Sequence, residues 1–263
     1  LTVKIRLGSS KSVFLDISGA KGYNSTCEIT SIYRGKNMKI IITAGGTSEK
    51  IDDVRTITNT STGRLGYAIG KAFVEKYAGR LEKIYYLHGT RAPYVEHELV
   101  EPVMIGGVAD LQQQLTRLLT EEKIDAVVHA MAVSDYVVKE VTTLDRIRGM
   151  ETPGGGADLS GNKISSDIDD LIIHMKRSPK VISIIKKLSP ETTLVGFKLL
   201  SGVPHEELIS VGRSLMEKND CDFVLANDVK EIGPDYHKGY LIHRDGTYDT
   251  MGNNEEIADM ISR

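Results

Sequence analysis

Short apolar runs alternate along this chain with segments in which apolar residues recur at helical spacing. From Met38 onward this alternation is typical of strands buried on both faces of a parallel sheet, with helices as the crossover connections. The apolar runs predict strands over residues 39–44, 83–88, 100–105, 124–130, 193–197 and 222–226. We therefore expect an α/β fold with a Rossmann-like, mostly parallel sheet and flanking helices.

Helical periodicity fills the intervals between these strands. It is carried by Leu65, Ala68, Ile69, Ala72 and Phe73, by Val108, Leu111, Leu115, Leu118 and Leu119, and by Leu208, Ile209, Leu215 and Met216. A further helix is predicted to open at Ser178 as N-cap, with Pro179 at the first helical position. The stretch "KGYLIHRDGTYDT" predicts a hairpin that turns at Asp245-Gly246, and a C-terminal helix follows it.

Two regions depart from the alternation. Residues 1–37 show no clear period and predict a dispensable leader, native or not, which leaves 38–263 as a single domain. Residues 140–162 contain Pro153 and glycines 154–156, too many turn formers for a core element. We interpret the region near 140–165 as a mobile flap.

Composition favours a small-molecule partner. The 33 Lys and Arg nearly balance the 36 Asp and Glu, which speaks against a nucleic-acid or membrane surface. Cys27 and Cys221 match no metal or disulfide spacing, as in a protein of a reducing compartment, and no apolar run approaches the ~18 residues of a membrane span. We expect a cytoplasmic protein.

Ligands of open parallel sheets bind beyond the carboxyl ends of the strands, so the residues at those ends outline the expected crevice. The first strand ends at Gly45-Gly46, which is neither a dinucleotide fingerprint nor a P-loop. A glycine pair alone is more often a turn of close approach than a phosphate site. Other strands end at "AMAVSD", at "GFK" and at "AND".

The stretch "NTSTGRLG" lies where a helix begins. It brings Asn59, Ser61, Thr62 and Gly63 to free backbone N–H groups, which favour an anion. Plain N-capping by the same residue types is the competing interpretation, and on this fragment alone we favour it by roughly two to one.

The other polar candidates each have an ordinary structural explanation. Lys163 could reach a polyphosphate from the end of the flap, or could simply be solvated. Asp135 could bind a base or sugar, hold Mg²⁺ through water, or cap a helix. Lys198 follows an apolar strand directly, so its amine should reach the crevice, whereas His129 is expected to be a core histidine. The Tyr67-x-x-x-Lys71 spacing of a dehydrogenase falls on the first helix and is set aside.

Taken together, these motifs resemble the phosphopantothenoylcysteine synthetase (phosphopantothenate-cysteine ligase) family in its standalone form. The resemblance runs from Met38 nearly to the C-terminus and rests on "ITAGGTSEKIDDVRTITNTSTGRLG", "AMAVSDY", "KISS", "MKRSPKVI", "VGFK" and "VLAND". No fused flavin-binding decarboxylase is expected, because 37 leader residues are too few to form one.

The resemblance implies a two-step ligation in coenzyme A biosynthesis. A nucleoside triphosphate with Mg²⁺ activates the carboxylate of 4'-phosphopantothenate and releases pyrophosphate, and the amine of L-cysteine then displaces the nucleotide to form an amide. CTP is the expected nucleotide because the chain resembles the short standalone bacterial form. ATP is the alternative, because "KISS", "SPK" and "GFK" depart from the bifunctional bacterial pattern and look closer to the eukaryotic, ATP-using branch. The resemblance also implies a homodimer that pairs through the "KGYLIHRDGTYDT" hairpin. The sequence shows no protein ligand set for a metal, so Mg²⁺ is expected only as the partner of the triphosphate.

The resemblance also assigns roles to individual residues. Asn59 is the catalytic amide, expected to donate to the acyl oxygen, and Lys163 the flap lysine that closes over the triphosphate. The resemblance also implies nucleotide binding for Gly45, Ser61, Gly63, Gly66, Met131, Ala132, Asp135 and Phe197, and substrate binding for Asn59 and Asn227. From their places at the expected crevice, Gly46 and Lys198 are added to the nucleotide site and Thr62 to the substrate site.

Two other functions remain compatible with the sequence. An NADP-dependent reductase would use the same kind of sheet, although the broken glycine fingerprint disfavours it. A nucleotide sensor without turnover would keep the crevice and lack the chemistry.

Overall fold

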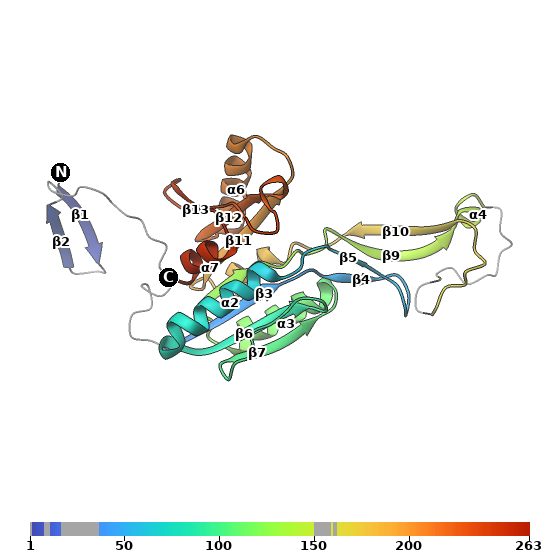
Figure 1. Ribbon diagram of the computed structural model, residues 1–263, viewed down its shortest axis with the longest axis horizontal. Helices are drawn as coiled ribbons and strands as arrows, with labels where there is room; N and C mark the ends of the chain where they lie inside the picture. The colour runs from blue at the N-terminus through green and yellow to red at the C-terminus, as the bar shows by residue number, and fades with distance from the viewer. Residues whose placement is uncertain (1, 8–10, 17–36, 150–158, 160–161) are drawn as a thin grey trace.

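A computed structural model of the chain describes all residues except 1, 8–10, 17–36, 150–158 and 160–161. Its centre is an eight-stranded sheet with the order β14-β13-β12-β11-β8-β3-β6-β7 (Figure 1). The strands are β3 (Met38–Ala44), β6 (Leu81–Gly89), β7 (Val100–Ile105), β8 (Ala126–His129), β11 (Thr193–Leu200), β12 (Phe223–Asp228), β13 (Gly239–His243) and β14 (Tyr248–Met251). The strands from β7 to β12 in this order pair in parallel, and β13 and β14 add an antiparallel edge. The predicted α/β fold is confirmed.

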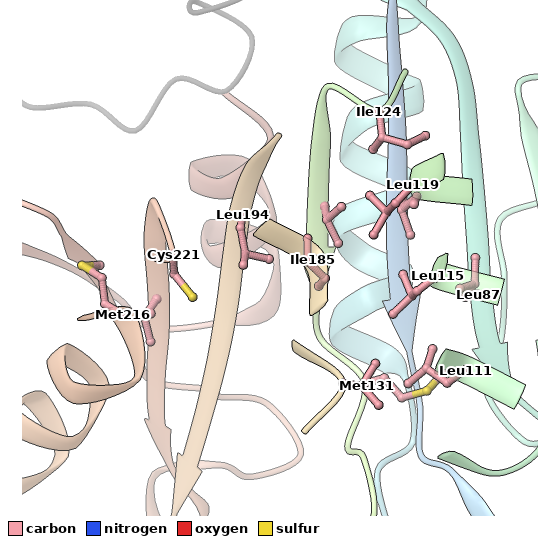
Figure 2. Packing of buried hydrophobic residues seen from close by; sticks show 14 of the residues in the cluster. Leu87, Leu111, Leu115, Leu119, Ile124, Met131, Ile185, Leu194, Met216 and Cys221 are labelled. Atoms are coloured by element: carbon pink, nitrogen blue, oxygen red, sulfur yellow. The ribbon is translucent and has the colours of Figure 1, made fainter. Parts of the chain in front are cut away.

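Helices cover both faces of this sheet because its inner strands are apolar on both faces. In β3, Ile40 and Ile42 belong to one core cluster and Ile41 to the other. Helices α2 (Arg64–Tyr77) and α7 (Asn254–Ser262) pack on the first cluster, and α3 (Val108–Glu121), α5 (Ile182–Leu188) and α6 (His205–Asn219) on the second. Figure 2 shows the second cluster, in which Leu111 and Leu115 of α3 face the sheet. Short 3-10 turns follow α2 and β12, as η1 (Ala78–Arg80) and η2 (Val229–Glu231).

The strand order reverses between β3 and β8. From β3 the chain proceeds to β6 and β7 on one side, and then returns to β8 on the other side of β3. The loops that leave β3 and β8 therefore diverge, and a crevice forms at their carboxyl ends. This topology determines where a ligand site is to be sought.

Two small ribbons lie beside the main sheet. β9 (Tyr136–Thr143) and β10 (Leu171–Arg177) form an antiparallel arm that projects from the body, and β4 (Ser48–Lys50) and β5 (Thr56–Thr58) lie near its base (Figure 1). The prediction of a loop from residue 140 is wrong at its start. The β-branched residues of β9 continue to Thr143 because they pair with β10, and helix α4 (Leu144–Ile147) follows. The glycines 154–156 lie outside the described residues.

Three further predictions can be compared with the structure. The hairpin turning at Asp245-Gly246 is confirmed as β13–β14, with Gly246 at φ 86°. The helix start at Ser178 is wrong, because Ser178 ties the chain to the β8 loop and α5 begins only at Ile182. Residues 1–37, which show no clear period in the sequence, contain an antiparallel pair, β1 (Thr2–Leu7) and β2 (Lys11–Asp16), and their predicted dispensability stays a prediction.

Candidate active site

A cavity of about 1080 Å³ opens at the carboxyl ends of β8, β11 and β12 and at the start of α2. Its walls come from the segments 59–66, 129–135, 178–182, 197–199, 227–237 and 253–255, with α6 contributing at its C-terminal end. The structure brings most of the predicted site residues together on these walls, namely Asn59, Ser61, Thr62, Gly63, Gly66, Met131, Ala132, Asp135, Phe197, Lys198 and Asn227. Gly45, Gly46 and Lys163 are not among the residues that line it.

The first turn of α2 faces this cavity. The N-cap residue is Gly63, with φ 76°, which has no side chain to cap the helix. Thr62 Oγ1 lies 3.5 Å from Arg64 N, at the outer limit of a hydrogen bond. The capping interpretation of this stretch is therefore wrong: the hydroxyls of Ser61 and Thr62 and the positive end of the helix remain available to an anion.

Asn59 is fixed by hydrogen bonds to the loop after β8. Its Nδ2 donates to Ala132 O at 2.9 Å and to Ser134 Oγ at 3.2 Å. Both amide hydrogens thus have protein partners, whereas Oδ1 accepts no hydrogen bond from the residues that the structure describes. The predicted donation from Asn59 to an acyl oxygen does not match this arrangement, in which the side chain can only accept.

The Gly45-Gly46 pair serves close packing beneath the cavity. Gly45 has φ 81°, and a Cβ on it would lie 2.6 Å from Ala92 Cβ. A Cβ on Gly46 would lie 2.9 Å from Asn59 Cβ. The strand-end backbones of β3 and β8 are joined here, because Ala132 N donates to Gly45 O at 2.8 Å. The turn of close approach proposed from sequence is the observed role.

The loop after β8 forms one wall with little free backbone. Met131 N donates to Thr43 Oγ1 at 3.1 Å, and Ala132 N and O are already bonded within the protein. Backbone contacts of a nucleotide at Met131 and Ala132 would therefore need other atoms than these. Asp135 is exposed at the cavity and forms an ion pair with Lys180, a residue that sequence reasoning missed.

His129 lies at the floor of the cavity and behaves as a core residue. It is 6 % exposed, and Thr43 Oγ1 lies 3.0 Å from its Nδ1. Burial lowers the pKa of His129 to about 4, so the ring is neutral at physiological pH. The prediction of a core histidine is confirmed.

On the opposite wall, Asn227 belongs to a relay that the sequence did not reveal. Asn227 Nδ2 donates to His237 Nε2 at 2.7 Å, and His237 Nδ1 donates to Asn254 Oδ1 at 2.7 Å. Burial lowers the pKa of His237, and its hydrogen bond with Asn254 works in the opposite direction. Ten residues separate Asn227 from His237 and 17 separate His237 from Asn254, so no local motif marks the relay.

Basic side chains suit this cavity to anionic ligands. Arg64, Lys180, Lys198 and Lys218 line it, against the acidic Asp135, Asp235 and Glu255. Within the described ranges, no group of three or more His, Cys, Asp or Glu side chains could hold a metal ion. In the same part of the chain, none of the helices combines the length and the apolar character that a membrane crossing requires.

Comparison with known proteins gives consistent results. The family described as "DNA/pantothenate metabolism flavoprotein C-terminal domain" matches residues 35–149 and 156–263. The "Coenzyme A biosynthesis bifunctional protein CoaBC" of Thermococcus kodakarensis is 32% identical over 207 residues, which are 79% of this chain and 45% of that protein. That of Methanocaldococcus jannaschii is 26% identical over 86% of this chain and 51% of its own length. The chain thus spans about half the length of these curated relatives.

Solved structures give the same picture. The "DNA/Pantothenate Metabolism Flavoprotein from Streptococcus pneumoniae" is 32% identical and superimposes with a TM-score of 0.75 over 85% of this chain and 96% of its own. A Cab2 variant in complex with phosphopantothenate-cysteine shares the fold, with a TM-score of 0.62 and 16% identity over 88% of this chain and 85% of that one.

Proposed function

Because the chain belongs to the family of the DNA/pantothenate metabolism flavoprotein C-terminal domain, we propose that it is a phosphopantothenate-cysteine ligase. It activates the carboxylate of 4'-phosphopantothenate with a nucleoside triphosphate and couples the acyl group to the amine of L-cysteine. The name of the bifunctional relatives and the ligand of the Cab2 complex support this assignment.

One observation carries the proposal: groups from distant segments, each suited to one part of this reaction, line a single cavity. The start of α2 offers N–H groups and hydroxyls to a phosphate, and Lys180 and Lys198 add positive charge. Asn59 and the relay at Asn227 offer fixed polar atoms to the acyl and pantothenoyl groups. Such prior placement of reactants and polar groups is what a two-step acyl transfer requires.

The nucleotide is proposed to be CTP, with ATP as the alternative. It enters as its Mg²⁺ complex, so the metal is part of the substrate. In the first step the carboxylate oxygen attacks the α-phosphorus and pyrophosphate leaves. The basic side chains of the cavity would hold the triphosphate during this step.

A homodimer is the proposed assembly. β14 is the outer strand of the main sheet, and its Tyr248 is 40% exposed. Exposed edge strands can pair with another chain. Sedimentation at several concentrations gives the mass, and one chain per particle would contradict the dimer. If the chains pair at β14, Tyr248→Lys should weaken the dimer and Ile147→Lys, on the arm, should not. Pairing at the arm would give the reverse result.

The ligase is tested by incubating the protein with phosphopantothenate and Mg²⁺, with CTP or ATP, and with or without cysteine. Pyrophosphate release and amide product are followed separately. We expect pyrophosphate from one nucleotide without cysteine, and amide only when cysteine is added. Absence of both products with either nucleotide would overturn the proposal.

A further inference from the structure

The orientation of the Asn59 amide follows from its surroundings. The atom that lies 2.9 Å from Ala132 O must be the nitrogen, because a backbone carbonyl can only accept a hydrogen bond. The second hydrogen of this nitrogen then goes to Ser134 Oγ, at 3.2 Å. Asn59 Oδ1 is therefore left as an acceptor at the cavity wall.

The direction of the hydroxyl bond behind Asn59 can be assigned in the same way. Thr47 is fully buried, so water cannot take the hydrogen of its hydroxyl. Among the described residues, Thr47 Oγ1 has two hydrogen-bond partners. Ser134 N, at 2.9 Å, is itself a donor, and the other partner is Ser134 Oγ, at 2.8 Å. The Thr47 hydroxyl must therefore donate to Ser134 Oγ.

Ser134 Oγ consequently accepts two hydrogen bonds, one from Thr47 and one from Asn59. The hydrogen of the Ser134 hydroxyl meets no acceptor among the described residues. Because Ser134 lines the cavity, this hydrogen can be donated to a ligand. The wall thus presents an acceptor, Asn59 Oδ1, next to a donor, the Ser134 hydroxyl. Both are held by a buried threonine, Thr47, in the loop that follows β3.

We infer that Ser134 is a catalytic residue of the amide-forming step, an inference that rests on the proposed ligase function. Its hydroxyl donates to the acyl oxygen, where negative charge develops, while Asn59 Oδ1 accepts an N–H of the attacking cysteine amine. The amine nitrogen bonds to the acyl carbon, and the bond from that carbon to the phosphate oxygen breaks. The nucleoside monophosphate leaves with the electron pair, and the surplus amine proton passes to water.

The test compares the two half-reactions of Ser134→Ala. We expect pyrophosphate release without cysteine to stay within about twofold of the parent, because no charge develops on the acyl oxygen in that step. Amide formation from the accumulated acyl-nucleotide should fall by roughly 100-fold, the effect of losing one oxyanion donor. Ser134→Thr keeps the hydroxyl and should retain most of the activity. Ser214→Ala, which removes an exposed hydroxyl of α6, is the control.

A double-mutant cycle separates direct contact from an effect through Asn59. If Ser134 only positioned Asn59, Ser134→Ala would have no further effect in an Asn59→Ala background, whereas a direct contact slows amide formation in both backgrounds. The inference is overturned if Ser134→Ala slows amide formation only in the protein that retains Asn59. It is also overturned if the rate of amide formation in Ser134→Ala stays within twofold of the parent. A parent protein that forms neither product would instead refute the ligase function itself.

Discussion

The Asp52 carboxylate accepts a hydrogen bond from the backbone N–H of Ile164, with 3.1 Å between Oδ2 and that nitrogen. The same carboxylate accepts from the N–H groups of Val54 and Arg55 and from the Arg55 guanidinium. Ile164 is buried and directly follows Lys163, which is exposed. One carboxylate therefore ties the β4–β5 turn to the segment that carries the proposed flap lysine.

Replacing Asp52 should destabilise the protein in a pH-dependent way. Burial alone would raise the pKa of Asp52, but the hydrogen bonds from Ile164, Val54 and Arg55 outweigh it and lower the pKa to about 2. A depressed pKa means that the contribution is present above the unfolded value of 3.8 and is lost as the pH falls toward 2. Urea unfolding should show Asp52→Asn less stable than the parent at pH 7, with the difference shrinking between pH 4 and pH 2. The exposed neighbour Asp53 gives the control, Asp53→Asn, which should match the parent throughout.

Adding a methyl group at Gly66 should push α2 away from the sheet. A Cβ there would lie 2.5 Å from Ala44 Cβ, in the core cluster beneath the helix. Overpacking costs about 1–3 kcal/mol, which exceeds the gain of about 1 kcal/mol from the helix propensity of alanine. We expect Gly66→Ala to lower the melting temperature by several degrees. Gly79→Ala is the matched control, because a Cβ at Gly79 would meet no atom within 4 Å. An equal decrease in melting temperature in both variants would contradict the packing argument.

Asn59→Asp should separate the two half-reactions. The aspartate would place a carboxylate oxygen against Ala132 O, where the parent has an N–H donor. Because two acceptor oxygens repel each other, the side chain would no longer be held in its present orientation. We expect the acyl-nucleotide still to form and amide formation to fall by roughly 10- to 100-fold. Quenched-flow analysis of both products measures the split. Asn37→Asp adds the same charge at an exposed position outside the cavity and should behave as the parent. Equal amide yields from Asn59→Asp and the parent would refute the role of Asn59 in amide formation.

Lys163→Ala should slow the first half-reaction, because a lysine that approaches the triphosphate neutralises its charge. A lost charge-assisted contact corresponds to a decrease of roughly 10-fold or more in pyrophosphate release. Lys187→Ala, which removes an exposed lysine of α5, provides the comparison. Lys163 does not line the cavity in this structure, so an unchanged rate would mean that the segment stays where Asp52 holds it.

The central fold could be predicted because its signal is local. An inner strand such as β3 is apolar on both faces, and this leaves an uninterrupted run of isoleucines in the sequence. The β9–β10 arm lacks such a run. Polar and charged side chains interrupt its short apolar stretches, at Lys139 and Glu140 in β9 and at His174 in β10, and what stabilises the arm is pairing between residues as far apart as Tyr136 and Arg177.

The same distinction applies to the site. Asn59 and Gly63 could be identified because they lie together in one polar stretch at a predicted helix start. Ser178 was misread because its hydroxyl is used by Ser134 O, 44 residues away in sequence, rather than by its own helix. The direction of the Thr47–Ser134 bond depends on burial and on the meeting of the loops that follow β3 and β8, which no sequence pattern encodes.

The C-terminal helix has a consequence for the order in which the molecule is completed on the ribosome. Asn253, Asn254 and Glu255 line the cavity, and α7 then packs beside α2, with Lys76 and Asp259 forming an ion pair. Domains generally fold as units, and a chain is synthesised from its N-terminal side. The first strand of the sheet is thus synthesised long before the last wall of the cavity, so a nascent chain cannot hold its substrates until α7, which also completes one core cluster, emerges.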